Sequence, residues 1–313
     1  MNRHLSVMPE KAIELLDIKE DGIYIDGTLG RGGHSRLILE RLTTGKLYCF
    51  DLDEEAIRES KENLKDFPNV EFIHDNYKNM FRYVEHADGI LLDLGVSSPQ
   101  FDDAERGFSY RYDGPLDMRM DQGDSLSAYD VVNGYSGEKL EKVLWEYGEE
   151  RFSRRIAQKI LENRPIETTM QLVDVIKSAL PAKVLHSKGH PAKQTFQAIR
   201  IEVNHELDSL KEFLDGFDPI LNEGGTVVII SFHSLEDRMV KQCFRRLSTV
   251  EDDKRIALRP EQIRKANYCL LNKGEKADEA EIENNHRAKS AIIRGVRKTN
   301  GKDRYEKKKK IEL

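Results

Sequence analysis

The sequence predicts an α/β protein built on an open, mostly parallel sheet that is interrupted by an inserted helical domain. Three observations lead to this fold class. Short β-like runs alternate with helical runs through the first hundred residues, residues from about 107 to 195 show helical periodicity without a strand, and an apolar run, TVVIISF, then resumes the strand pattern. The expected domains are 1–106 with 196–313 for the sheet and 107–195 for the insertion.

The strands are expected at short runs rich in β-branched and aromatic residues, which are 22–26, 46–51, 70–74, 89–94 and 226–232, with a last strand within 289–298. Helices are expected at 34–42 and 53–67, between the first strands. The run at 226–232 is apolar throughout, as in a central strand buried on both faces. Ser234 is expected to cap the following helix, because SLED has the form of a capping box.

The insertion is preceded by a long polar loop, residues 97–125, of a length that is commonly functional. Three helices are expected after it, at 138–147, 151–160 and 169–180, each with apolar residues at helical spacing. A further helix is expected to lead back into the sheet, with one apolar side formed by Phe196, Ile199, Val203, Leu207, Leu210 and Leu214.

The composition is that of a globular protein, since 38% of the 313 residues are apolar and 34% are charged with both signs. No apolar run has the length of a signal-peptide core or a membrane span, so the expected location is cytoplasmic. The three cysteines, Cys49, Cys243 and Cys269, lie far apart and outside any Cys-x-x-Cys spacing. We therefore expect no metal site.

The formal net charge of −6 does not by itself predict a nucleic-acid binder. Basic residues are nevertheless concentrated in 237–265 and in the terminal run KDRYEKKKKIEL. Two interpretations stay open, a local basic face or a solvated helix surface followed by a polar tail.

A glycine-rich stretch, DGTLGRGGHS at 26–35, follows the first strand and precedes a helix. Doubly wound sheets bind nucleotides at this place, because glycine lets the backbone turn tightly and lets a ligand lie against it. A tight turn without a ligand is the alternative. Ser35 stands where a dinucleotide site needs its third glycine or alanine, and the Gly-Lys-Ser/Thr of a phosphate loop is absent. A nucleoside-type cofactor without a pyrophosphate fits better.

Polar residues follow the next strands at the same expected edge of the sheet. Asp53, preferred over Asp51, is expected either to accept hydrogen bonds from ribose hydroxyls or to cap the helix after it. Tyr77 is a candidate to pack against an adenine, with loop packing as the alternative. Asp93 is a candidate to accept a hydrogen bond from an amine, or it caps the following turn.

Several long motifs together resemble one known family. They are DGTLGRGGHS, LLDLGVSSPQFDDAERGFSY, DGPLDMRMD, HPAKQTFQAIRIEVNHEL and SFHSLEDRMVK. These stretches are similar to signatures of the bacterial ribosomal RNA small-subunit methyltransferase H family, and the resemblance runs from His4 to about Arg297.

The resemblance implies a class I methyltransferase (Rossmann-like) sheet and an S-adenosylmethionine-dependent enzyme that methylates the N4 amine of a cytidine in 16S ribosomal RNA. It implies cofactor contacts from Gly32, Gly33, His34, Asp53, Tyr77, Asp93 and Gln100. The inserted helical domain, 107–195, is then expected to recognise the substrate. The implied partner is small-subunit ribosomal RNA or the ribosomal subunit, without a membrane, and a homodimer is a candidate assembly.

The residues favour transfer to N4 over transfer to C5 of cytosine. C5 transfer needs a cysteine nucleophile, usually after a proline, and none of the three cysteines follows a proline. N4 transfer needs positioning and removal of a proton, for which Asp93 is the catalytic candidate.

Contacts with a flipped-out base and its phosphates are expected from the loop after Asp93 and from one later strand end. The candidates are Arg106, Phe108, Asp117, Arg119 and His233. A catalytically silent RNA-binding module on the same fold is the alternative from another class, and a nicotinamide oxidoreductase is a more distant one.

Overall fold

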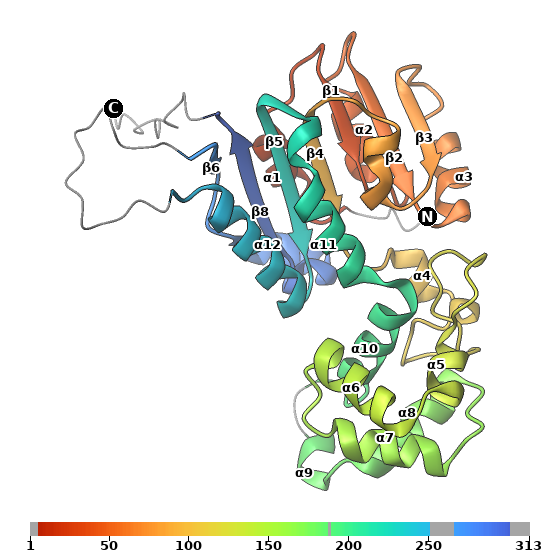
Figure 1. The fold of residues 1–313 in the computed structure, drawn as a ribbon. Coiled ribbons are helices and arrows are strands. Elements are labelled where there is room, and N and C mark those ends of the chain that lie inside the picture. The colour runs from red at the N-terminus through yellow and green to blue at the C-terminus, as the bar shows by residue number, and fades with distance from the viewer. Residues whose placement is uncertain (1–5, 187–188, 251–265, 301–313) are drawn as a thin grey trace, which may run out of the picture. The chain divides into compact units, whose positions relative to one another are not determined.

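The structure, a computed structural model, describes residues 6–186, 189–250 and 266–300. The chain forms two compact units (Figure 1). The first, the sheet unit, consists of residues 1–95 and 209–313, and the second, the helical unit, consists of residues 96–208.

The sheet unit contains one sheet whose strands run in the order β3-β2-β1-β4-β5-β8-β6, with β7 paired to β8. The strands are β1 (Ile23–Asp26), β2 (Lys46–Asp51), β3 (Val70–His74), β4 (Ala87–Asp93), β5 (Leu221–Ser231), β6 (Tyr268–Leu270), β7 (Glu275–Lys276) and β8 (Ile292–Lys298). Strands β1 to β5 are parallel to one another, β8 pairs antiparallel with β5, and β6 and β7 pair antiparallel with β8. All six strands expected from the sequence are confirmed.

The central strands are buried on both faces, which explains their continuous apolar runs. Ile25, Leu92 and Ile229 pack into one hydrophobic cluster. Their chain neighbours Tyr24, Leu91 and Val228 pack into a second cluster, as the alternation of side chains along a strand requires. The sheet therefore separates two cores.

Helices cover both cores of the sheet unit. They are α1 (Pro9–Leu16), α2 (Gly33–Leu39), α3 (Glu54–Asn63), α11 (Glu206–Gly216, which spans the boundary between the units), α12 (Ser234–Leu247) and α13 (Glu279–Asn284), with the 3₁₀ helices η1 (Tyr77–Arg82), η3 (Asp218–Ile220) and η5 (His286–Ser290). Leu16, Ile38 and Ile57 from α1, α2 and α3 line one core, whereas Phe213 and Phe244 from α11 and α12 line the other.

The helical unit has a core of its own, to which its helices and the loop before them contribute. The helices are α4 (Ser98–Asp102), η2 (Ala104–Arg106), α5 (Ala128–Gly134), α6 (Gly137–Gly148), α7 (Ser153–Glu162), α8 (Thr169–Ala179), α9 (Ala182–Leu185) and α10 (Lys193–Asn204). Leu144, Ile156, Val173 and Ile199 are fully buried there. The three helices expected at 138–180 are confirmed as α6, α7 and α8.

Three expectations about local structure are wrong. The helix expected through 196–214 is two helices, because His205 takes a left-handed conformation (φ 50°) between α10 and α11. Phe196, Ile199 and Val203 lie in the core of the helical unit, so that unit extends to Asp208 instead of ending at 195. The residue that caps α12 is His233 and not Ser234.

The basic residues expected in 251–265 and the terminal run at 302–313 lie outside the described residues. Among the residues that the structure describes, no helix is long and apolar enough to cross a membrane.

One buried amide joins α10 to the loop that precedes α5. The Nδ2 of Asn204 donates to the carbonyl of Met118 (2.8 Å), and its Oδ1 accepts from the N–H of Met120 (2.7 Å). We expect Asn204→Ala to lower the free energy of unfolding by about 2 kcal/mol, because it leaves buried backbone groups unpaired. Urea denaturation followed by circular dichroism would measure this, with the exposed Gln158→Ala as control. An effect no larger than that of the control would contradict it.

Candidate functional site

The site candidates of the sheet unit lie where parallel strands end. β1 lies between β2 and β4, so the carboxyl ends of three strands meet at one edge. The chain runs from β1 outward through β2 to β3 and then returns to β4 on the other side of β1. Open α/β sheets bind their ligands at such a reversal of strand order.

The glycine-rich stretch after β1 forms a tight loop that leads into α2. Gly30 and Gly32 have positive φ angles of 51° and 77°, a conformation that favours glycine. The N–H of Gly27 donates to Leu91 of β4, and the N–H of Leu29 donates to Phe50 of β2 (both 2.9 Å). The loop is therefore held by the strands on both sides of β1.

Glycines 27 and 33 are required by close packing within the protein. A Cβ atom on Gly27 would clash with Leu92 and lie 2.9 Å from the Cβ of Tyr77, and one on Gly33 would clash with the Ser6 hydroxyl. The space left by the missing side chains of these two glycines is thus filled by other residues of the protein. Gly30, in contrast, has no atom within 4 Å of where its Cβ would lie, among the residues described.

Two aspartates that were not chosen as site residues from the sequence hold this loop in place. Asp51, at the end of β2, accepts from the N–H of Gly30 (2.7 Å) and from that of Asp53 (2.9 Å). Asp26, at the end of β1, accepts from the Ser35 hydroxyl (2.6 Å) and from the N–H of Thr28 (3.2 Å). Their position at strand ends was a signal in the sequence, but their hydrogen bonds depend on the folded loop.

Asp93, at the end of β4, faces His34 at the start of α2. The Nδ1 of His34 lies 3.6 Å from the Oδ2 of Asp93, and its Nε2 lies 2.9 Å from the carbonyl of Val7. Because a carbonyl only accepts, Nε2 carries a hydrogen and Nδ1 is the nitrogen directed at the carboxyl group. The lone pair of Nδ1 therefore faces a lone pair of the carboxylate oxygen. One proton on either Asp93 or His34 removes the repulsion between them.

The second carboxyl oxygen of Asp93, Oδ1, is buried and has no hydrogen-bond partner among the residues described. An unpaired buried carboxyl oxygen is costly unless a ligand or water satisfies it. The backbone N–H of Asp93 is occupied, because it donates to the Thr28 hydroxyl (2.6 Å). Asp93 thus offers an acceptor atom next to the glycine loop.

Burial makes all three acids at this edge reluctant to ionise. It raises the pKa of Asp26 and of Asp51 to about 6 and the pKa of Asp93 to about 7, although His34 lowers the last of these. The charges of Asp26 and Glu236 raise the pKa of Asp93 further, and that of Arg287 opposes them. This edge of the sheet suits a cationic ligand, and the carboxyl group of Asp93 is suited to exchange a proton near neutral pH.

Asp53 and Tyr77 lie beside this loop. Asp53 is nearly buried and caps α3, where its carboxylate accepts from the N–H of Glu55 (3.0 Å). The capping role considered for Asp53 is therefore confirmed, and its ribose contact stays a prediction. Tyr77 begins η1 and packs edge to face against Phe213, with ring centroids 5.9 Å apart.

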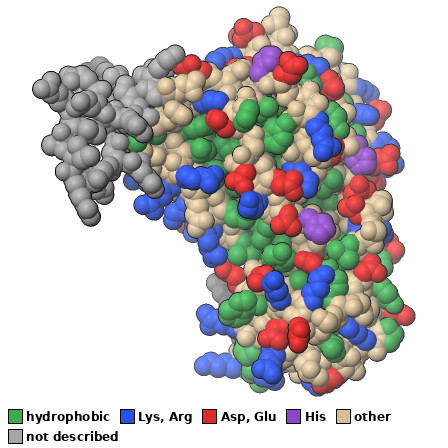
Figure 2. Space-filling model, in the orientation of Figure 1, with side chains coloured by type: hydrophobic (Ala, Val, Ile, Leu, Met, Phe, Trp, Pro, Cys, Tyr) green, Lys and Arg blue, Asp and Glu red, His purple; other side chains and the backbone are tan. Residues whose placement is uncertain are grey.

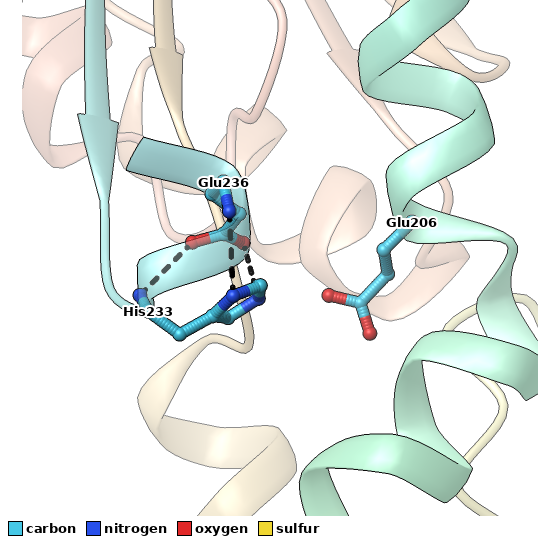
Figure 3. A group of neighbouring side chains, drawn as sticks. All are labelled: Glu206, His233 and Glu236. Carbon is cyan, nitrogen blue, oxygen red and sulfur yellow. Dashed lines mark hydrogen bonds and ion pairs between the residues drawn. The ribbon is translucent and has the colours of Figure 1, made fainter. Parts of the chain in front are cut away.

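His233 is held by Glu236 of the same helix start (Figure 3). Its Nδ1 accepts from the N–H of Glu236 (3.4 Å), and its Nε2 lies 3.1 Å from the Glu236 Oε1. The other carboxylate oxygen of Glu236 accepts from the N–H of Phe232 (2.8 Å). Nε2 is buried and has no hydrogen-bond partner among the residues described, so its contact with Glu236 is an ion pair only when His233 is protonated. Glu236, which the sequence reasoning passed over, organises the end of β5.

The other predicted site residues belong to the helical unit, and several of them already form hydrogen bonds or core contacts within that unit. Gln100 accepts from the N–H of Ser97 (3.0 Å) in the capping box of α4. Arg106 is buried and donates to the carbonyls of Arg119 and Met120, and Phe108 is part of the core. Arg119 donates to the Asp117 carboxylate and to the carbonyls of Gln122 and Asp124.

These bonds order the loop expected at 97–125. They leave Arg106 and Arg119 without the exposed, uncommitted guanidinium that phosphate recognition requires. Their substrate role stays a prediction, as does that of Asp117, Phe108 and His233.

Comparisons with known proteins agree on one family. The family model described as the MraW methylase family matches residues 1–299. A curated relative, "Ribosomal RNA small subunit methyltransferase H" from Mesoplasma florum, is 48% identical over 302 residues, which cover 94% of this chain and 98% of the relative.

Solved structures resemble the chain at low identity. An rRNA methylase from Streptococcus thermophilus has 14% identity and a TM-score of 0.40, over 93% of this chain and 94% of that one. A protein from Streptococcus mutans solved in complex with SAH also has 14% identity and a TM-score of 0.40, over 94% and 98%.

The raised pKa of Asp93 predicts a stability effect with a definite sign. A carboxyl group whose pKa is about 7 in the folded protein, against 3.8 ordinarily, stabilises the fold when protonated, and this contribution is lost as the pH rises from about 4 through 7. We therefore expect Asp93→Asn to raise the stability of the protein at pH 8, on the order of 2–4 kcal/mol, and to have little effect at pH 4. Thermal denaturation at both pH values would measure it.

The exposed Asp66→Asn is the control for this substitution, because its carboxyl group has no ion pair among the residues described. A stabilisation by Asp93→Asn that is equal at the two pH values would contradict the raised pKa.

Proposed function

Because the chain belongs to the MraW methylase family, we infer that it catalyses methyl transfer from S-adenosylmethionine to the N4 amine of a cytidine in small-subunit (16S) ribosomal RNA. The chain is thus an S-adenosylmethionine-dependent RNA methyltransferase with a class I sheet. A nicotinamide oxidoreductase is excluded by this membership.

The residues at the sheet edge fit this cofactor. S-adenosylmethionine carries a sulfonium and an ammonium group, and the edge presents three carboxyl groups, at Asp26, Asp51 and Asp93. The buried, unpaired Oδ1 of Asp93 is the single observation that carries the proposed site, because it marks an acceptor that the described protein residues leave unsatisfied.

We propose the same cofactor-binding residues that the sequence indicated. Gly32, Gly33 and His34 would lie against the methionine and ribose portions, the Asp53 carboxylate would accept from the ribose hydroxyls, and Tyr77 would pack against the adenine. Gln100, which follows Asp93 closely in the chain, would complete the set. Asp26 and Asp51 support these residues by holding the loop.

When bound, the cofactor supplies an electrophilic methyl group on its sulfonium. The task of the protein is to position the cytidine amine and to remove a proton from it. We propose that Asp93 accepts a hydrogen bond from the N4 amine and takes its proton. The pKa of about 7 suits this role, because a base is most effective when its pKa lies near the working pH.

A cysteine nucleophile has no place in this reaction. Cys49 and Cys243 are buried, and burial raises the pKa of both thiols, so neither forms a reactive thiolate readily. This supports N4 over C5 as the methylated atom.

The substrate base must leave its RNA stack to reach the end of a buried strand. Phe108 is buried, so a stacking partner from the same loop is better sought in Tyr112, which is 55% exposed.

We propose a cytoplasmic location, because the proposed substrate is ribosomal RNA. The homodimer stays a prediction, and light scattering of the purified protein would check it.

Asp93→Asn tests the proposed role of the carboxylate. We expect it to lower kcat for RNA methylation by about 100-fold or more, because the amide cannot take the proton. Transfer of labelled methyl groups to 16S RNA or small subunits from a strain lacking the protein would measure the rate, and nucleoside mass spectrometry would identify the product. Asp66→Asn is the control.

Two outcomes would contradict separate parts of the proposal. If the N4-methylcytidine content of ribosomal RNA is the same with and without the protein, the function is wrong. If Asp93→Asn methylates at the wild-type rate, the function stands and the role of Asp93 is wrong.

The pH dependence of the rate follows from the same group. Below its pKa, Asp93 is protonated and cannot accept the amine proton, so kcat/KM should rise about tenfold per pH unit below pH 7 and level off above it. A pH profile of kcat/KM for the RNA, measured with saturating cofactor, would show this. Samples incubated with cofactor but without RNA at each pH would control for enzyme stability. A flat profile between pH 5.5 and 8 would contradict it.

A further inference from the structure

The start of α7 carries an unusual set of basic side chains. Arg151, Arg154 and Arg155 are all exposed, and no carboxyl group of the described residues forms an ion pair with any of them. No acidic residue occurs between Arg151 and Leu161. Glu149 and Glu150 directly precede the segment, but neither forms an ion pair with these arginines among the described residues.

The arginines are also placed unfavourably for the helix. Arg154 and Arg155 lie in the first turn of α7, at the end where the helix dipole is positive, and this turn has no acidic residue and no side-chain cap. The neighbouring helices α5 and α6 follow the usual pattern, with Asp130 and Glu138 in their first turns and serine caps. Nothing within the helix accounts for two arginines at this position.

A fourth basic residue comes to the same end of the helical unit from α10. The side chain of Gln194 donates to the carbonyl of Glu149 (3.4 Å), just before Arg151, and the backbone of Gln194 lies against Gly148. This places Lys193, which is exposed and also without an ion pair among the described residues, next to the end of α6. We call Arg151, Arg154, Arg155 and Lys193 the basic patch.

Three lysines on α6, α7 and α8 are paired. Lys142 lies 4.0 Å from Glu146, Lys159 lies 2.7 Å from Glu162, and Lys177 lies 3.8 Å from Asp174. In Figure 2, Lys and Arg side chains gather at the lower left of the helical unit, near α6 and α9. Arg111 and Lys183 are also exposed and without an ion pair among the described residues, but each stands alone. The start of α7 differs because it holds three such cations within residues 151–155.

We propose that the basic patch binds the phosphate backbone of the substrate RNA. Arginine suits phosphate because its planar donors match two phosphate oxygens, and a polyanion relieves the repulsion among four neighbouring cations. The patch contacts phosphates and not bases, so it contributes affinity and orientation without reading the sequence. This proposal rests on the proposed function, since it identifies the surface that holds the same RNA.

The test replaces three charges in the patch by R151Q/R154Q/R155Q and three paired charges by K142Q/K159Q/K177Q. We expect the patch variant to raise KM for 16S RNA about tenfold, with kcat within twofold of wild type. The dependence of log Kd on log salt should become shallower by about 2 to 3, because each lost phosphate contact removes close to one unit of slope. The control variant, which loses the same net charge, should change neither by a comparable amount.

Two further measurements separate this proposal from a folding defect and from the proposed function. The melting temperature of the patch variant should equal or exceed that of wild type, because unfavourable charges are removed. Binding of S-adenosylhomocysteine, measured by calorimetry, should be unchanged. An unchanged KM and salt slope in the patch variant, or equal losses in both variants, would overturn the proposal.

If wild type fails to methylate RNA, the proposed function is wrong, and RNA binding by filter retention then tests the patch alone. Wild-type RNA binding by the patch variant in that assay would show that the patch serves another partner, and would also overturn the proposal.

Discussion

The parallel pairing of β1 with β2 on one side and β4 on the other is the constraint on which the candidate site depends. It brings Asp26, Asp51 and Asp93 to one edge although they are up to 67 positions apart in the sequence. The same pairing anchors the glycine loop, whose N–H groups reach carbonyls of both neighbouring strands. The loop, the acids and the start of α2 therefore form one structural element.

That arrangement also explains why acids accumulate where burial opposes their charge. Each acid is placed at the end of a strand that is buried on both faces, so desolvation raises its pKa, and hydrogen bonds from the loop only partly compensate. Asp26 and Asp51 have such bonds. The Oδ1 of Asp93 has no such bond among the described residues, and the pKa of Asp93 is the highest of the three, at about 7.

The fold could be predicted from the sequence because its strands are short apolar runs bounded by turns, and each helix of the insertion shows its own period. The positions of Asp93 and of the glycine loop at strand ends could also be predicted, whereas the role proposed for Asp93 stays a prediction. The burial of Arg106 and Phe108 could not be predicted, because the core that covers Phe108 is completed by helices up to 95 positions later, such as the one with Val203. Nor could local spacing show that Asp51, and not only Asp53, holds the loop.

The segment from Ser6 to Met8 is part of the wall around His34. Gly33 packs against Ser6, the carbonyl of Val7 fixes the tautomer of His34, and the N–H of Met8 is bound by the Glu281 carboxylate. A purification tag or fusion partner joined immediately before this segment would consequently be attached next to the contacts that hold His34. Strand β8, which ends at Lys298, is in contrast separated from β1 by β4 and β5, so Lys298 has no part in holding His34.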